Sequence, residues 1–188
     1  MKKLCDLEAV EARRLIGLKE ISPVELLESC IERTESVNDA VNAIVTTNYE
    51  NARLEAKVAE KAVLDGDELG LIHGLPVGIK DLESTKGIRT TMGSLIYEKH
   101  VPDADQLSVS NIRSEGGIIL GKTNTPEFGA GANTKNRVFG VTGNPFDTDL
   151  SCAGSSGGSA VSLACGMVPL ASGSDFGGSL RTPAGFCG

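Results

Sequence analysis

Residues 75–81 read Leu75-Pro76-Val77-Gly78-Ile79-Lys80-Asp81, a short apolar run that ends in two charged side chains. A run of this kind is typical of a buried strand. Further along the chain, residues 107–114 have the pattern of a helix, and Ile118-Ile119-Leu120 has that of a second buried strand. Because strand and helix alternate, the sequence predicts an α/β fold.

The residues that precede this run predict an acidic layer of helices. Apolar side chains recur at helical spacing between residues 4 and 16. Ser22 can cap a second helix, with Pro23 at its first position and Glu25 completing a capping box, and we expect this helix to run to about Val37. Residues 40–46 are predicted to form a short strand. Residues 49–64 should form a third helix, which Asp65-Gly66-Asp67 ends.

The residues that follow are rich in glycine and serine, with 10 Gly and 8 Ser between residues 143 and 188. One interpretation is a flexible linker. The apolar segments Val161–Ala164 and Met167–Ala171 argue against it, because a linker does not carry segments of buried character. The sequence therefore favours a set of turns in which glycine permits close approach of the main chain.

Charge and composition exclude several classes of partner. The 188 residues carry a formal net charge of −7, with 15 acidic and 9 basic residues in positions 1–70 and 10 against 9 afterwards. An acidic balance disfavours nucleic acid and anionic membranes as partners. Tryptophan is absent and aromatic residues make up 4%, which argues against a stacking platform for single-stranded nucleic acid.

Cysteine and histidine content predicts neither a disulfide framework nor a metal site, and no cofactor is expected. The five cysteines are widely spaced and form no CxxC motif, and there are two histidines. The residues after Met1 do not resemble a signal peptide, because Asp6, Glu8 and Glu11 interrupt the apolar region that such a peptide needs. The most apolar stretch, residues 160–171, is shorter than the roughly 20 residues needed to span a bilayer. We therefore expect a cytoplasmic protein.

Residues 116–123 satisfy the pattern GxxxxGK[ST] of a phosphate-binding P-loop. The context does not fit, because Ile118-Ile119-Leu120 is itself the predicted strand and cannot curl around phosphate. Pro126 would also disrupt the helix that should begin at the lysine. The sequence therefore predicts no P-loop here.

Three elements together could carry chemistry: Lys80 at the end of a strand, the serines of residues 154–159, and residues 175–181 (Asp-Phe-Gly-Gly-Ser-Leu-Arg). Each alone has an ordinary interpretation, since lysine is usually solvated and Ser/Gly clusters usually form turns. Together they offer a nucleophile, a base and an oxyanion site without histidine.

These elements resemble the amidase signature family of serine amidohydrolases. The matching segments are Gly74–Asp81, Gly121–Phe128, Gly143–Pro145, Gly154–Ala160 and Gly177–Ser179. The spacing is specific, because Ser179 lies 24 residues after Ser155, which lies 75 residues after Lys80. The resemblance covers essentially the whole chain and implies a mixed β-sheet surrounded by helices.

The resemblance also implies a Ser–Ser–Lys triad. Ser179 would be the nucleophile, Ser155 the bridging serine, which the family usually holds by a cis peptide, and Lys80 the base. A lysine accepts a proton only when neutral, so burial beside Val77 and Ile79 must lower its pKa. The oxyanion hole would be formed by main-chain N–H groups from Phe176, Gly177 and Gly178 up to the nucleophile Ser179. The expected supporting residues are Asp81, Ser156, Asp175 and Arg181.

Two features depart from the family pattern. Ala153-Gly154 stands where Gly-Gly is usual, and the added methyl group should be tolerated. Family members are also generally much longer, so we expect residues 1–188 to be a single amidase-signature domain truncated at its C-terminus. Its parts would be a helical layer (1–70) and a portion of the catalytic core (71–188).

The resemblance implies an amidase that hydrolyses a carboxamide to a carboxylate and an amine or ammonia, acting on a small-molecule amide. Residues 125–131 favour a stand-alone enzyme. One alternative is the glutamine-hydrolysing subunit of a tRNA-dependent amidotransferase. Another is an inactive fragment whose exposed sheet edge binds a partner or a second copy of itself.

Overall fold

The computed structural model describes residues 3–188 and confirms the α/β prediction. A four-stranded sheet has the order β1–β3–β2–β6, formed by Ile44–Thr47, Ile118–Thr123, Pro76–Lys80 and Leu170–Ala171. β2 runs parallel to β3 and to β6, whereas β1 is antiparallel to β3, so the sheet is mixed. A second, two-stranded sheet pairs β4 (Lys135–Asn136) with β5 (Gly140–Val141).

The N-terminal helices form as predicted, with shifted boundaries. α1 spans Ala9–Gly17, α2 spans Pro23–Val41 and α3 spans Tyr49–Asp65. The capping box at the start of α2 is present, since Ser22 Oγ accepts the N–H of Glu25, whose carboxylate accepts the N–H of Ser22. α2 continues four residues beyond Val37 and ends at Asn42 in the left-handed conformation (φ 52°), so the next strand begins at Ile44 rather than residue 40.

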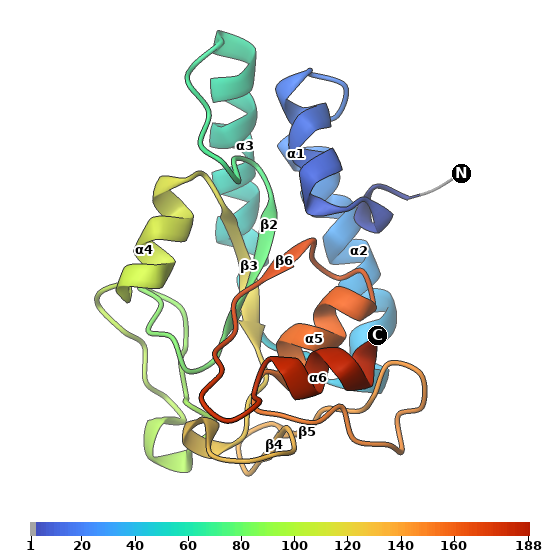
Figure 1. The fold of residues 1–188 in the computed structure, drawn as a ribbon. Coiled ribbons are helices and arrows are strands. Elements are labelled where there is room, and N and C mark those ends of the chain that lie inside the picture. Colours follow the sequence, from blue (N-terminus) through green and yellow to red (C-terminus); the bar gives the residue numbers. More distant parts are fainter. Residues whose placement is uncertain (1–2) are drawn as a thin grey trace.

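Helices cover both faces of the sheet (Figure 1). The larger core joins α1, α2, α3 and α5 (Gly157–Ala164) to Ile118 and Leu120 of β3. The smaller core packs α4 (Leu107–Ser114) against Val77, Ile79 and Ile119 on the opposite face. The final helix, α6 (Arg181–Cys187), contacts α5.

A break in strand register decides where two lysines point. Val77 is paired with Ile119, but Gly78 is paired with Gly121, so β3 contains one extra residue at this point. Lys122 is consequently the partner of Ile79, and Lys80 is the partner of Thr123. Because partners in neighbouring strands share a face and successive residues alternate, Lys80 and Lys122 lie on opposite faces of the sheet.

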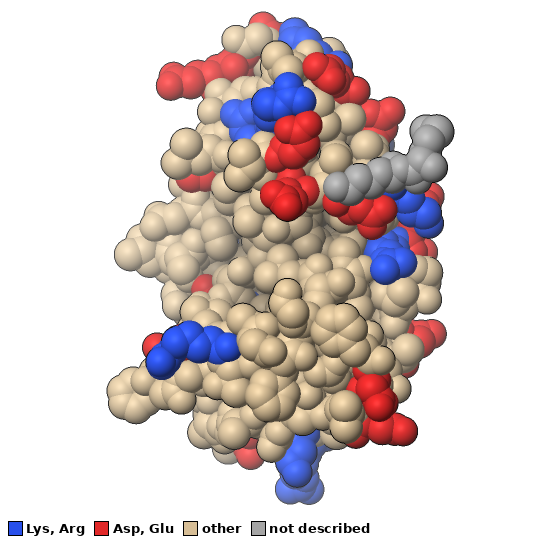
Figure 2. Space-filling model, turned by 45° about the vertical axis from the view of Figure 1, so that its right-hand side comes forward, with Lys and Arg blue, Asp and Glu red and all other residues tan. Residues whose placement is uncertain are grey.

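Charged residues are unevenly distributed over the surface. On the face shown in Figure 2, they are dense at the end of the molecule that carries α1 and α3, and sparse across the middle. This agrees with the acidic excess of residues 1–70. No helix within residues 3–188 is long and apolar enough to cross a membrane.

Candidate active site

Lys80 is the last residue of β2, and its side chain is completely buried against the start of α5. Its Nζ donates hydrogen bonds to Ser155 Oγ at 2.7 Å, Ser156 Oγ at 2.9 Å and Ser174 Oγ at 3.0 Å. Three hydroxyl groups therefore satisfy the three donors of the ammonium group. The structure brings together Lys80, Ser155 and Ser156 as the sequence predicts.

The turn before α5 aims its serines at Lys80. The Gly154–Ser155 peptide bond is cis, as the resemblance implied. A side chain at Gly158 would collide with the main-chain amide of Asn124, so glycine allows α5 to approach the end of β3 closely. Ser155 and Ser156 are both buried. The Gly/Ser-rich segment is thus a tightly packed turn and helix start, and the linker interpretation is wrong.

Burial controls the proton affinity of Lys80. Loss of solvent lowers its pKa from 10.5 to about 8, while the charges of Glu83 and Asp175 oppose that shift. A pKa near 8 leaves a substantial neutral fraction close to neutral pH, which a general base requires.

Ser179 contacts Ser156, the residue that follows the proposed bridging serine. The N–H of Ser156 donates to the carbonyl oxygen of Ser179 at 3.1 Å, which ties the two segments together. The Ser179 side chain is half-buried, and its hydroxyl forms no hydrogen bond with any other residue between 3 and 188. The hydroxyl of Ser179 is therefore uncommitted, in a residue whose main chain contacts Ser156, the neighbour of Ser155.

The loop that leads to Ser179 is shaped by Asp175. Its carboxylate accepts the N–H of Gly178 at 2.7 Å and of Leu180 at 3.1 Å, and forms an ion pair with Arg181 at 3.0 Å. These contacts hold the pKa of Asp175 far below its ordinary value, first through the hydrogen bond with Arg181. Asp175 and Arg181, two of the expected supporting residues, thus lie in contact with each other.

The predicted oxyanion donors differ in availability. Within the described part of the chain, the main-chain N–H groups of Phe176, Gly177 and Ser179 have no protein acceptor. The N–H of Gly178 is engaged by Asp175. These three unpaired amides are free to donate a hydrogen bond to a new acceptor.

Asp81 acts on a neighbouring turn rather than on the lysine. Its carboxylate accepts the hydroxyl of Thr91 at 2.6 Å and the N–H of Thr91 at 3.1 Å. Burial raises the pKa of Asp81, and the hydrogen bonds from Thr91 oppose this. Its contribution is to fix the loop that follows β2.

Sequence reasoning missed three polar residues around this site and one buried lysine on the opposite face of the sheet. Ser174 is a third acceptor for Lys80 Nζ, and Ser172 Oγ accepts the main-chain N–H of Lys80 at 2.9 Å. Glu83 accepts the hydroxyl of Ser172. Lys122 is fully buried in the strand Ile118–Thr123, which also confirms that no P-loop forms there. The available signals were two serines at alternate positions after a strand, and a lysine at the end of an apolar strand.

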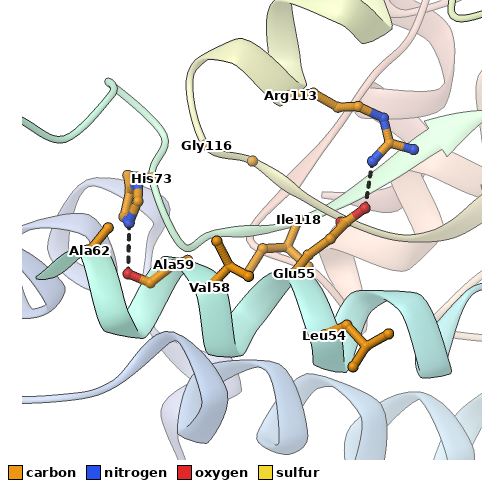
Figure 3. A pocket seen from close by; sticks show the side chains of 10 residues that line it. Leu54, Glu55, Val58, Ala59, Ala62, His73, Arg113, Gly116 and Ile118 are labelled. Atoms are coloured by element: carbon orange, nitrogen blue, oxygen red, sulfur yellow. Dashed lines mark hydrogen bonds and ion pairs between the residues drawn. The ribbon is translucent and has the colours of Figure 1, made fainter.

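Two surface cavities differ in chemistry. One of about 390 Å³ adjoins the site and is lined by Ser156, Ser172 and Leu180 together with apolar residues of α5 and α6. Another of about 410 Å³ lies against α3 (Figure 3). Its polar side chains are already engaged, because His73 Nε2 donates to the Ala59 carbonyl and Arg113 pairs with Glu55. Within residues 3–188, no group of three His, Cys, Asp or Glu side chains could hold a metal ion.

Fold and site together define a class of α/β protein in which a buried strand-end lysine contacts the serines of a Gly/Ser-rich turn. A family model described as Amidase matches residues 25–188. The chain therefore belongs to the amidase family, as its sequence motifs indicated.

The chain is similar to curated proteins in sequence and to parts of solved structures in fold. The chain is 43% identical over 178 residues to a glutamyl-tRNA(Gln) amidotransferase subunit from Persephonella marina, matching 95% of this chain and 37% of that protein. Among solved structures, it resembles a bacterial aryl acylamidase of the amidase signature family (TM-score 0.89, 36% identity, 95% of this chain and 37% of that one). It also resembles 6-aminohexanoate cyclic dimer hydrolase complexed with substrate (TM-score 0.89, 34% identity, 100% and 37%). The chain thus spans little more than a third of these relatives.

Proposed function

We propose that this chain supplies the nucleophile and base of an amidase, which hydrolyses a carboxamide C–N bond through an acyl-enzyme on Ser179. The observation that carries the proposal is the 2.7 Å contact between Lys80 Nζ and Ser155 Oγ, together with the main-chain bond that ties Ser179 to the adjacent Ser156. In this proposal, residues 1–70 are the helical layer of one amidase-signature domain, and residues 71–188 are its catalytic portion.

The proposed reaction needs only these side chains and water. Ser179 Oγ attacks the amide carbon while its proton passes to Ser155, whose own proton passes to neutral Lys80. Collapse of the tetrahedral intermediate breaks the C–N bond, and the leaving amine takes a proton returned through Ser155. Water then hydrolyses the ester on Ser179 to release the carboxylate. The amides of Phe176, Gly177 and Ser179 are the proposed donors to the oxyanion.

A fluorophosphonate serine probe tests this proposal. We expect an adduct at Ser179 in the purified chain, located by mass spectrometry, and its loss in Ser179→Ala. An adduct at Ser155 or Ser156 would contradict the assignment of the nucleophile. A folded sample with no adduct would favour the alternative of an inactive fragment.

A second candidate is glutamine hydrolysis within an amidotransferase. The names of the curated relatives favour it, since the Persephonella protein is a glutamyl-tRNA(Gln) amidotransferase subunit. Release of glutamate from glutamine, compared with release of aniline from simple acylanilides, separates this candidate from a stand-alone amidase. We propose small-molecule amides as the direct partners, a cytoplasmic location, and self-association as a property to check by gel filtration.

A further inference from the structure

Glu83 lies three residues beyond Lys80, at the carboxyl end of β2, and its two carboxylate oxygens contact two different elements. Oε1 accepts the hydroxyl of Ser172, which directly follows β6. Oε2 accepts the hydroxyl of Ser108, in the first turn of α4, at 2.5 Å. Both oxygens are thus committed to serine donors, although Glu83 is only half-buried.

Ser172 connects this carboxylate to Lys80. A hydroxyl group has one hydrogen, and that of Ser172 is directed at Glu83. A lone pair of Ser172 Oγ is therefore free to accept the main-chain N–H of Lys80 at 2.9 Å. The N–H of Ser172 in turn donates to Gly78 at 2.8 Å, so this residue extends the pairing of β2 with β6 past Ala171.

The same strand end positions the third contact of the lysine. Ser174 follows Ser172 by two residues and accepts from Lys80 Nζ at 3.0 Å. A displacement of Ser172 would therefore move both the main-chain partner and a side-chain partner of Lys80.

Glu83 also differs from the other acidic residues near Lys80 in the partners of its carboxylate. Asp175, in the loop after β6, is paired with Arg181, and the carboxylate of Asp81 is turned to Thr91. The helix packed above the site, α5, contains no charged residue. Lys122 of β3 lies on the other face of the sheet, where its Nζ donates to the Glu83 carbonyl and the charge of Glu83 raises its pKa too, against the larger effect of burial. The carboxylate of Glu83 forms no ion pair within residues 3–188.

We propose that Glu83 is a positioning residue for Lys80, which orients Ser172 against the main chain of the lysine and supplies the negative charge that balances its buried ammonium group. The proposal deepens the proposed function, because it treats Lys80 as the base. Glu83 touches no reacting atom in this assignment and acts only through Ser172 and through its charge.

The charge has a measurable consequence. Burial lowers the pKa of Lys80 to about 8 and the charge of Glu83 raises it, so Glu83→Gln should lower this pKa further. A decrease of about one unit would raise the neutral fraction of Lys80 at pH 7 from about one-tenth to about one-half, roughly fivefold.

Nuclear magnetic resonance tests the proposal without any assay of activity. The ¹³Cε shift of Lys80, assigned with Lys80→Met, is followed against pH in the whole 188-residue chain. Glu83→Gln should titrate at lower pH than the native protein. Glu127→Gln is the matched control, because Glu127 also accepts a serine hydroxyl, that of Ser94 at 2.7 Å, and should leave the titration unchanged. Equal titration in Glu83→Gln and the native protein would overturn the electrostatic part of the proposal.

A second variant tests the positioning role with the charge intact. Ser172→Ala removes the acceptor of the Lys80 N–H, so hydrogen exchange of that amide should accelerate at least tenfold. Unchanged protection would overturn the role of Ser172, even if Glu83→Gln failed to fold.

A final measurement separates this proposal from the proposed function. If Ser179 reacts with the fluorophosphonate, the acid limb of its rate should move to lower pH in Glu83→Gln. If Ser179 does not react in any variant, the proposed function fails, while the lysine titration still decides the role of Glu83.

Discussion

Two buried lysines at the same end of one sheet have opposite surroundings. Lys80 and Lys122 are both completely buried, and burial lowers the pKa of each from 10.5 to about 8. The register shift between β2 and β3 separates them. If the register set by Val77 and Ile119 continued without this shift, Lys122 would be the partner of Lys80 and would lie beside it on the same face, where two ammonium groups would repel each other.

The partners of the two ammonium groups differ in what they can do with a proton. Lys122 Nζ donates to the Glu83 carbonyl at 2.5 Å, to Thr85 Oγ1 and to Thr90 Oγ1. Both threonine hydroxyls donate in turn to carbonyl groups, so no proton can pass along this network. Ser155, in contrast, accepts from Lys80, and its hydroxyl proton has no protein acceptor within residues 3–188. A lowered pKa is therefore insufficient for a base, and an adjacent hydroxyl with an uncommitted proton is also needed.

The largest expected effect separates the two lysines directly. Lys80→Met should reduce the rate of fluorophosphonate labelling at Ser179 by about 100- to 10,000-fold, the usual contribution of a general base. Lys122→Met should keep labelling within about tenfold of the native rate, because Lys122 lies on the other face. Rates from mass spectrometry, with circular dichroism to verify folding, make the comparison. Equal losses in both variants would mean that the two lysines do not differ in function.

A smaller effect sharpens the comparison among the serines. Ser155→Ala should slow labelling at Ser179 by about 100-fold or more, because it removes the proposed proton relay. Ser156→Ala should cost less, since the hydroxyl of Ser156 is directed to the Ser174 carbonyl at 3.2 Å and serves only as an acceptor for Lys80. Single-turnover rates at pH 8 test the order. A greater loss in Ser156→Ala than in Ser155→Ala would exchange the roles of these neighbours.

Local sequence patterns predict the helices and strands of the fold. The capping box of Ser22 and Glu25, the helix Leu107–Ser114 and the apolar strand before Lys80 are all local features, and each is confirmed. The meeting of Lys80 with Ser155 and Ser156 followed from the family resemblance, and the structure places them in contact.

What the sequence did not predict depends on long-range geometry. Ser172 and Ser174 reach Lys80 only because the two-residue strand β6 pairs with β2, more than 90 residues earlier in the chain. Ser/Gly-rich segments indicate turns but give no pairing partner. The face on which Lys122 lies depends on the register shift in β3, and lysine is rarely buried, so hydropathy alone would assign it to the surface.

The smallest effect concerns stability against pH. Between about pH 8 and 10.5, Lys122 keeps its proton in the unfolded chain and loses it in the folded one, so folding stability should rise with pH. Burial raises the pKa of Cys30 and Cys187 to about 12, which has the opposite effect above pH 9. That cysteine contribution cancels when the native protein is compared with Lys122→Met. The difference in free energy of unfolding between the native protein and Lys122→Met, from urea denaturation, should therefore move in favour of the native protein by at most about 1.4 kcal/mol per pH unit.

Lys80→Met should show the same slope, because its pKa is also about 8 in the folded chain. A flat difference for Lys122→Met alone would mean that the carbonyl and threonine acceptors keep Lys122 protonated across this range. The two lysines would then differ in proton affinity as well as in neighbours. Only Lys80, which contacts Ser155, Ser156 and Ser174, would lose its proton in this pH range. Equal slopes would mean that the two lysines have the same proton affinity, so their difference in function would come from the Ser155 hydroxyl beside Lys80.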